Sequence, residues 1–169
     1  ESLKKLAHDP SVLVLVENTS NLVDNRFVHC IDRVLNSISD HQKSEFAPDL
    51  LITIGGAVVS KRIKTFLRQC KPQQHWKIGY DFLFMDTYQA LTLSIPMYEA
   101  DCFNTVAEFN PIEDATYWTQ WKQIDYLVQE KANRFFETTV DFGDPLVFHT
   151  LLDYIPESTH LHMANSSVI

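Results

Sequence analysis

The feature that most constrains the fold is the segment from Asp49 to Arg68, DLLITIGGAVVSKRIKTFLR. It opens with the apolar run LLITI at 50–54, whose length and β-branched residues are typical of a strand buried on both faces. Two glycines follow and indicate a tight turn, because glycine adopts backbone angles closed to other residues. Ser60 is a good N-cap for the helix that the apolar spacing after it predicts. The segment therefore predicts one strand–turn–helix half of a parallel-sheet unit.

Lys61 and Arg62 fall in the first turn of this predicted helix. The amino end of a helix carries about half a positive charge, so each cation there costs roughly 0.3–1 kcal/mol unless an anion is near. Free backbone N–H groups, a glycine turn and two cations together indicate an anion site. The alternative is that both side chains extend into solvent or pair with surface carboxylates. Ligands of doubly wound sheets bind at the carboxyl ends of strands, which favours the anion site.

Apolar patterns in the rest of the chain predict further strands and helices. Strands are expected at 12–16, 75–80, 94–100 and 159–163, the third at a sheet edge because Pro96 removes a ladder donor. Besides the helix from Lys61, helices are expected at 1–8, 27–38, 102–109, 118–135 and 144–155. This alternation predicts an α/β fold with a Rossmann-like open parallel sheet and flanking helices.

The pattern changes after Asp114, where a domain boundary is expected. Residues 1–114 are interpreted as a central Rossmann-like domain and residues 115–169 as the helical beginning of a second α/β domain. Because the chain starts at Glu1 and a helix end precedes its first strand, the first domain is expected to be truncated at its amino end. Trp118 and Trp121 form an aromatic stripe, which we expect to be exposed or covered by a partner copy.

Composition narrows the class of protein. With 45% hydrophobic and 21% charged residues the chain is typical of globular proteins, and its formal net charge of −8 argues against nucleic acid or an anionic membrane as partner. No apolar stretch is long enough for a membrane span. Cys30, Cys70 and Cys102 are too scattered for a zinc site and are expected to be buried free thiols. His160 and His162, on one face of the predicted last strand, are interpreted as packing or surface residues.

Three segments also resemble a known family. They are the IGG turn, S-K-R helix start and Cys-Lys-Pro…His-Trp sequence within 49–80, the closing HMANSSVI at 162–169, and the segment 12–21. These resemble the central domain and the first strand and loop of the third domain of 2-succinyl-5-enolpyruvyl-6-hydroxy-3-cyclohexene-1-carboxylate synthases. Those are thiamine-diphosphate-dependent enzymes of menaquinone biosynthesis. The resemblance rests on these three segments and not on residues 81–114.

The resemblance implies a definite activity for the full-length protein. Such enzymes decarboxylate 2-oxoglutarate and add the succinyl-semialdehyde unit to isochorismate, using thiamine diphosphate and Mg²⁺. Residues matching Lys61, Arg62 and Ser166 contribute to the substrate site. The groups that bind cofactor and metal belong to parts of the enzyme outside this chain, so we expect residues 1–169 alone to be inactive and to bind neither. The resemblance further implies a cytoplasmic homo-oligomer.

Two alternatives remain open from the sequence. One is a non-catalytic Rossmann-like module that binds a small anion or a nucleotide, although the absence of G-x-G-x-x-G weighs against a dinucleotide. The other is the central domain of another thiamine-diphosphate enzyme. The sequence does not identify the carboxylate that Lys61 and Arg62 would bind.

Overall fold

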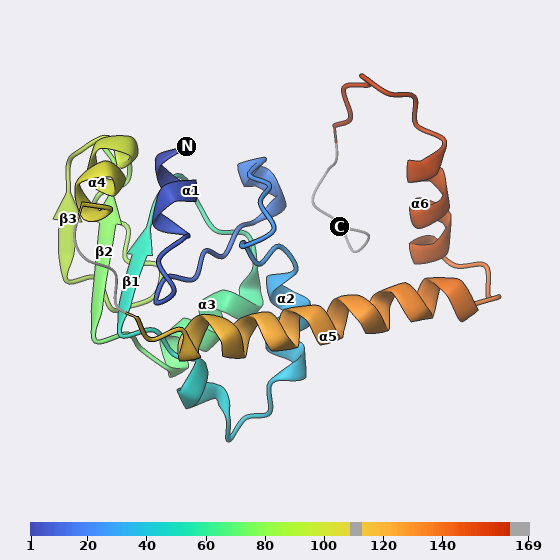
Figure 1. The fold of residues 1–169 in the computed structure, drawn as a ribbon, viewed down its shortest axis with the longest axis horizontal. Coiled ribbons are helices and arrows are strands. Elements are labelled where there is room, and N and C mark those ends of the chain that lie inside the picture. Colours follow the sequence, from blue (N-terminus) through green and yellow to red (C-terminus); the bar gives the residue numbers. More distant parts are fainter. Residues whose placement is uncertain (109–112, 163–169) are drawn as a thin grey trace. The chain divides into compact units, whose positions relative to one another are not determined.

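The computed structural model describes residues 1–108 and 113–162. Residues 1–128 form one compact unit and residues 129–169 form a second. The first contains a parallel sheet, the helices α1 to α4 and the first half of α5, whereas the second contains the rest of α5 and α6 (Figure 1).

The sheet consists of three parallel strands in the order β1-β2-β3, namely β1 (Leu50–Thr53), β2 (Gln74–Ile78) and β3 (Leu93–Ile95). Leu51 pairs with His75, and Lys77 pairs with Ser94, which fixes the register. β3 has β2 as its neighbour and ends just before Pro96, as expected for an edge strand. The predicted α/β class with a parallel sheet is thus confirmed.

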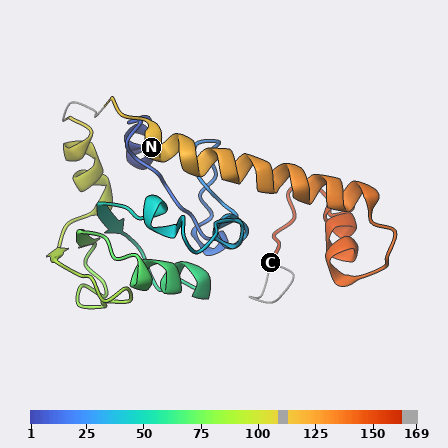
Figure 2. The same cartoon turned by 90° about the horizontal axis from the view of Figure 1, so that it is seen from below.

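Helices cover both faces of this sheet (Figures 1 and 2). On one face lie α2 (Ile31–Ser37), α3 (Lys61–Gln69) and the first half of α5 (Thr116–Thr138), and on the other lie α1 (Ser2–Leu6) and α4 (Glu99–Val106). Strand β1 divides its side chains with the period of two that a strand imposes. Leu51 packs against the α2–α3 cluster, and Ile52 packs against the α1–α4 cluster.

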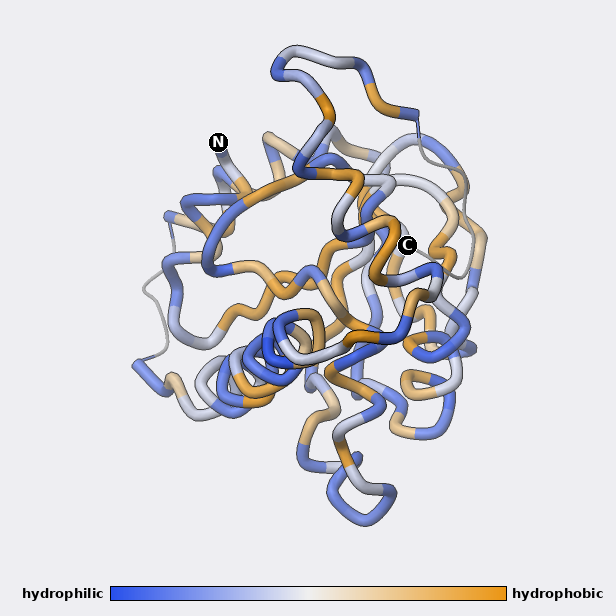
Figure 3. The backbone as a smooth tube through the Cα atoms, turned by 90° about the vertical axis from the view of Figure 1, so that its right-hand side faces the viewer, coloured by the Kyte–Doolittle hydropathy of each residue, from blue (hydrophilic) through white to orange (hydrophobic). Residues whose placement is uncertain are grey.

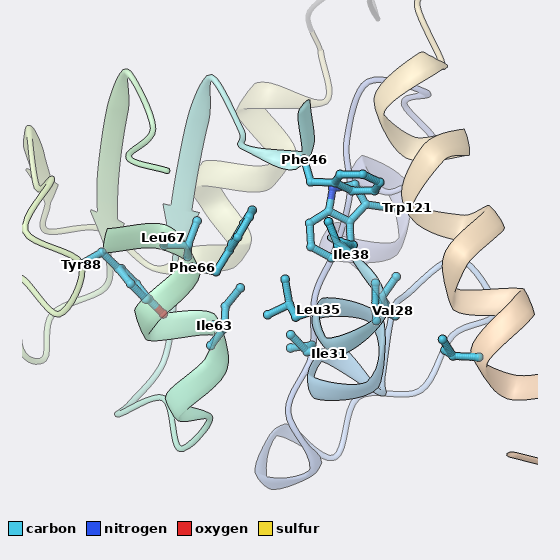
Figure 4. Close-up of a cluster of buried hydrophobic side chains, with 12 residues drawn as sticks. Val28, Ile31, Leu35, Ile38, Phe46, Ile63, Phe66, Leu67, Tyr88 and Trp121 are labelled. Carbon is cyan, nitrogen blue, oxygen red and sulfur yellow. The ribbon is translucent and has the colours of Figure 1, made fainter. Parts of the chain in front are cut away.

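The larger hydrophobic core lies between α2 and α3 (Figure 4). Ile63, Phe66 and Leu67 recur at helical spacing in α3 and are each about 3% exposed, so the helix buries one continuous stripe. Trp121 of α5 is fully buried and packs edge-on against Phe46, with ring centroids 5.5 Å apart. The short 3₁₀ helix η2 (Lys43–Phe46) supplies that phenylalanine.

The position of Trp121 corrects one expectation. The sequence suggested that the Trp118–Trp121 stripe is exposed or covered by a partner copy, but Trp121 is buried within its own chain. Trp118 is half-buried, and the guanidinium of Arg26 lies 4.7 Å from its ring centroid. Figure 3 shows hydrophobic and hydrophilic residues alternating along the turns of α5, which is the pattern of a helix with one buried side.

The prediction of a strand at 12–16 was wrong, because these residues do not form a regular strand. Its backbone forms only an isolated parallel bridge, in which Val28 donates to the Val14 carbonyl and Val16 donates to the Val28 carbonyl. The run is apolar because its side chains contribute to all three hydrophobic clusters. Its backbone pairs with Val28, so α2 begins at Ile31 and the helix expected from Phe27 is shorter than predicted.

The last predicted strand was also wrong over its described part, because residues 159–162 contain no strand and Met163 lies outside the described residues. The helix expected at 144–155 forms as α6 (Asp144–Asp153), with Pro145 in its first turn, where a missing N–H leaves no hydrogen bond unmade. His160 and His162 are exposed. The first compact unit ends at Val128, inside α5. The domain boundary expected after Asp114 stays a prediction.

Candidate functional site

The candidate site lies around the turn that joins β1 to α3. Gly55 has φ +70°, a left-handed conformation that strains any residue with a Cβ, so the turn requires glycine there. Apart from the adjacent residues of the chain, no atom of the described residues lies within 4 Å of the position that a Cβ would take at Gly55 or Gly56. Both glycines are exposed, so the turn opens to solvent at the carboxyl end of β1.

Ser60 caps α3 as predicted. Its hydroxyl oxygen accepts a hydrogen bond from the Ile63 N–H at 3.1 Å, which satisfies one of the free donors at the helix start. The same hydroxyl donates to the carboxylate of Asp32 on α2. The helix start is therefore tied to a neighbouring helix as well as to its own first turn.

Glu17 accepts hydrogen bonds from the backbone just before this helix, a contact that was not predicted from the sequence. Its carboxylate accepts the Val59 N–H at 2.8 and 3.0 Å and the Ser60 N–H at 2.7 Å. An internal carboxylate thus occupies the N–H groups of the two residues that precede α3, and it offsets the charge of the helix end. The only signal in the sequence was an acidic residue directly after the apolar run 12–16.

Lys77 of β2 binds the backbone of the glycine turn. Its ammonium donates to the Gly55 carbonyl at 2.5 Å, and the residue is 5% exposed. Burial lowers the pKa of Lys77, while the charges of Glu99 and Asp81 raise it in part. The sequence signal was a lysine inside the apolar strand HWKIGY, which the sequence analysis did not single out.

Lys61 and Arg62 lie in the first turn of α3, as predicted, and both are exposed. No acidic residue shares that turn. Within residues 1–108 and 113–162, neither side chain forms an ion pair or a hydrogen bond, so their positive charges are not neutralised by a direct partner. Ser166, the third predicted site residue, lies outside the described residues.

A surface hollow of about 230 Å³ adjoins these two cations. Its lining combines charged and apolar side chains from α2, η2 and α3. The lining residues are Leu35, Lys43, Lys61, Arg62, Thr65 and Phe66. A larger hollow of about 420 Å³ in the second unit has no basic lining residue and so is a poor match for an anion.

In the described part of the chain, none of the helices combines the length and the apolar character that a membrane span requires. Nor do three or more His, Cys, Asp or Glu side chains gather there as metal ligands. Cys30, Cys70 and Cys102 are free thiols, and only Cys102 is buried, which raises the pKa of its thiol.

Comparison with known proteins identifies relatives over nearly the whole chain. Residues 1–163 match the family described as "Middle domain of thiamine pyrophosphate". The chain is 35% identical over 167 residues to the 2-succinyl-5-enolpyruvyl-6-hydroxy-3-cyclohexene-1-carboxylate synthase of Flavobacterium johnsoniae, covering 99% of the chain and 30% of that protein.

Proteins of the same name in two other bacteria are also similar. The one from Flavobacterium psychrophilum is 36% identical over 165 residues, covering 97% of the chain and 30% of the relative. The one from Bacteroides thetaiotaomicron is 34% identical over 141 residues, covering 82% and 24%. The chain thus spans about 30% or less of the length of these relatives. The family resemblance seen in the sequence is confirmed, and the chain belongs to the family of thiamine pyrophosphate middle domains.

Proposed function

We propose that this chain is the central part of a thiamine-diphosphate-dependent synthase in menaquinone biosynthesis. The full-length enzyme would decarboxylate 2-oxoglutarate and add the succinyl-semialdehyde unit to isochorismate. The name shared by the relatives supports the reaction. Thiamine diphosphate and Mg²⁺ would be bound by parts of the enzyme outside residues 1–169.

The role proposed for this chain is to bind a substrate carboxylate with Lys61 and Arg62, together with Ser166. One observation carries the proposal: two adjacent cations at the start of α3 lie exposed beside a hollow and lack carboxylate partners among the described residues. Since Glu17 already holds the backbone N–H groups of residues 59 and 60, a substrate carboxylate would be bound by these side chains. Arg62 can bind it through two parallel hydrogen bonds, whereas Lys61 supplies a point charge.

The test measures activity and stability together in the full-length enzyme. Lys61→Ala and Arg62→Ala should each lower kcat/KM for one carboxylate substrate about ten- to a hundredfold, since a charge-assisted hydrogen bond contributes roughly 1.5–3 kcal/mol. Ser166→Ala should cost about 1 kcal/mol, as expected for one neutral donor. Rates for 2-oxoglutarate and isochorismate, measured separately, identify the substrate that is bound here.

Lys71→Ala is the matched control, because Lys71 is an exposed lysine just beyond the other end of α3. It should change neither substrate's kcat/KM. Thermal unfolding should be nearly unchanged in all variants, since removing an unpaired surface cation from a helix start costs little. If Lys61→Ala and Arg62→Ala lose stability but keep full activity toward both substrates, the two cations are structural and the proposal is wrong.

A further inference from the structure

The hollow beside α3 is lined by a third cation that comes from a different element. Lys43 belongs to η2, some twenty residues before Lys61 in the chain, and lines the hollow together with Lys61 and Arg62. The chain as a whole is acidic, with a formal net charge of −8, but these three cations make the surface around the hollow locally basic. Such a cluster attracts anions by its local field.

Besides the three cations, the hollow is lined by two apolar side chains and by Thr65. Leu35 and Phe66 are 6% and 3% exposed, so the hollow borders the hydrophobic core that Figure 4 shows. At about 230 Å³ the hollow is smaller than the roughly 300–1,000 Å³ pockets that hold drug-sized ligands. Cations beside an apolar surface suit a small molecule with a hydrocarbon body and separated negative charges. A compact inorganic anion would leave the apolar surface unused.

Lys43 already has a partner that a ligand can replace. Its Nζ lies 2.7 Å from Oδ1 of Asp40, and the Lys43 side chain is 26% exposed whereas that of Asp40 is 95% exposed. Lys43 lowers the pKa of Asp40 through a hydrogen bond and its charge, so Asp40 is ionised and can act as a counterion. A solvent-exposed ion pair contributes little to stability, so exchanging its carboxylate for that of a ligand costs little.

We propose that Lys43 is a third substrate-binding residue, which binds the second carboxylate of a dicarboxylate whose first carboxylate lies at Lys61 and Arg62. Asp40 holds Lys43 in the absence of this ligand and is displaced when it binds. This inference rests on the proposed function and adds to it a specificity for two carboxylates over one. It also explains how an acidic protein would retain an acidic substrate.

The test uses the full-length enzyme and succinate as an unreactive dicarboxylate, with propionate as its one-carboxylate counterpart and inorganic phosphate as a compact anion. Calorimetric titration should show that Lys43→Gln weakens succinate binding about three- to tenfold and leaves propionate binding unchanged. Asp40→Asn should tighten succinate binding about two- to threefold, because Lys43 then has no competing carboxylate. In Lys43→Gln, adding Asp40→Asn should have no further effect.

Lys71→Gln is the control for loss of one positive charge and should leave succinate binding unchanged. The inference is overturned if Lys43→Gln behaves like Lys71→Gln, if Asp40→Asn fails to tighten binding, or if phosphate binds as tightly as succinate and loses affinity equally in Lys43→Gln. Its failure is distinct from that of the proposed function. If Lys61→Ala and Arg62→Ala lower kcat/KM but Lys43→Gln leaves succinate binding unchanged, only the role of Lys43 is refuted.

Discussion

At the scale of single residues, the Ser60 hydroxyl makes two hydrogen bonds at the start of α3. It accepts from the N–H of Ile63 in the same helix and donates to Asp32 on α2. Ser60→Ala should lower the free energy of unfolding by about 1 kcal/mol, within the roughly 0.5–2 kcal/mol observed for N-cap serines. Urea denaturation of the chain measures this. Thr65→Ala is the control, because this exposed hydroxyl on the same helix donates only to the Lys61 carbonyl. Equal midpoints for both variants would show that the cap does not stabilise the helix.

His75 makes stability depend on pH. It is 1% exposed on β2, and its Nε2 lies 2.9 Å from the Thr53 hydroxyl. Its Nδ1 has no hydrogen-bond partner among residues 1–108 and 113–162. Burial lowers the pKa of His75 and the charge of Lys77 lowers it further, while Asp86 opposes both. Because the folded pKa lies below the unfolded value of about 6.5, the unfolded chain binds the proton more readily between the two values.

The free energy of unfolding should therefore fall as the pH drops below about 6.5 toward the folded pKa, by at most about 1.4 kcal/mol per pH unit. Urea midpoints at about pH 7.5 and about pH 5.5 measure the loss. His75→Gln retains an acceptor for Thr53 but does not titrate, so its loss over the same interval should be smaller. An equal loss in both proteins would assign the pH dependence to other groups.

Residues with local signals could be predicted, and residues with distant partners could not. Ser60, Lys61 and Arg62 were found because a cap and a first turn are defined within a few residues of sequence. Glu17 binds the backbone of residues some forty positions later, and Lys77 reaches Gly55 over 22 positions. No periodic pattern encodes such contacts, so the internal anion at the helix start became visible only in the structure.

At the scale of elements, β1 and α3 were predicted from local signals, whereas the conformation of the segment 12–16 depends on a distant partner. β1 and α3 carry their own apolar period and boundary residues, so the sequence predicts both. The segment 12–16 is equally apolar, but a strand also needs a partner with free backbone groups. Its partner is Val28, which the sequence placed inside a helix. Apolar composition thus predicted burial correctly and backbone pairing incorrectly.

The first half of α5 carries an ion pair between two of its own residues, and one of them also binds the backbone of Phe27. Lys122 donates to Asp125 at 2.7 Å and to the Phe27 carbonyl at 3.2 Å, and Asp125 is 1% exposed. Lys122→Met should lower the free energy of unfolding by about 3–5 kcal/mol, because it leaves a buried carboxylate without its cation. Lys122→Met combined with Asp125→Leu should recover most of this loss, since an apolar pair needs no counterion.

Urea denaturation of the two single variants and the double variant measures the coupling between these residues. Lys131→Met is the control, because Lys131 is an exposed lysine further along the same helix. If Lys122→Met unfolds at the same urea concentration as Lys131→Met, neither the ion pair nor the Lys122 hydrogen bond to Phe27 stabilises the chain.

At the scale of the whole molecule, burial is unequal between the two units. Every residue that is buried among those described lies at or before Val128. In the described part of 129–169, several large apolar side chains are more than three-quarters exposed, namely Val140, Phe142 and Tyr154. Hydrophobic burial supplies most of the free energy of folding, so the first unit should hold nearly all the stability of the chain.

Two shortened chains distinguish the boundary suggested by the sequence from the one found in the structure. A chain ending at Ala132 retains Trp121, Asp125 and Val128, and one further helical turn supplies the N–H group that the Val128 carbonyl needs. It should unfold in one cooperative transition with a urea midpoint close to that of residues 1–169.

A chain ending at Asp114 loses the fully buried Trp121, and removing such a large core side chain costs about 3–5 kcal/mol by itself. Its transition should therefore shift to much lower urea or lose cooperativity. Equal midpoints for the two shortened chains would show that the first half of α5 does not stabilise the first unit.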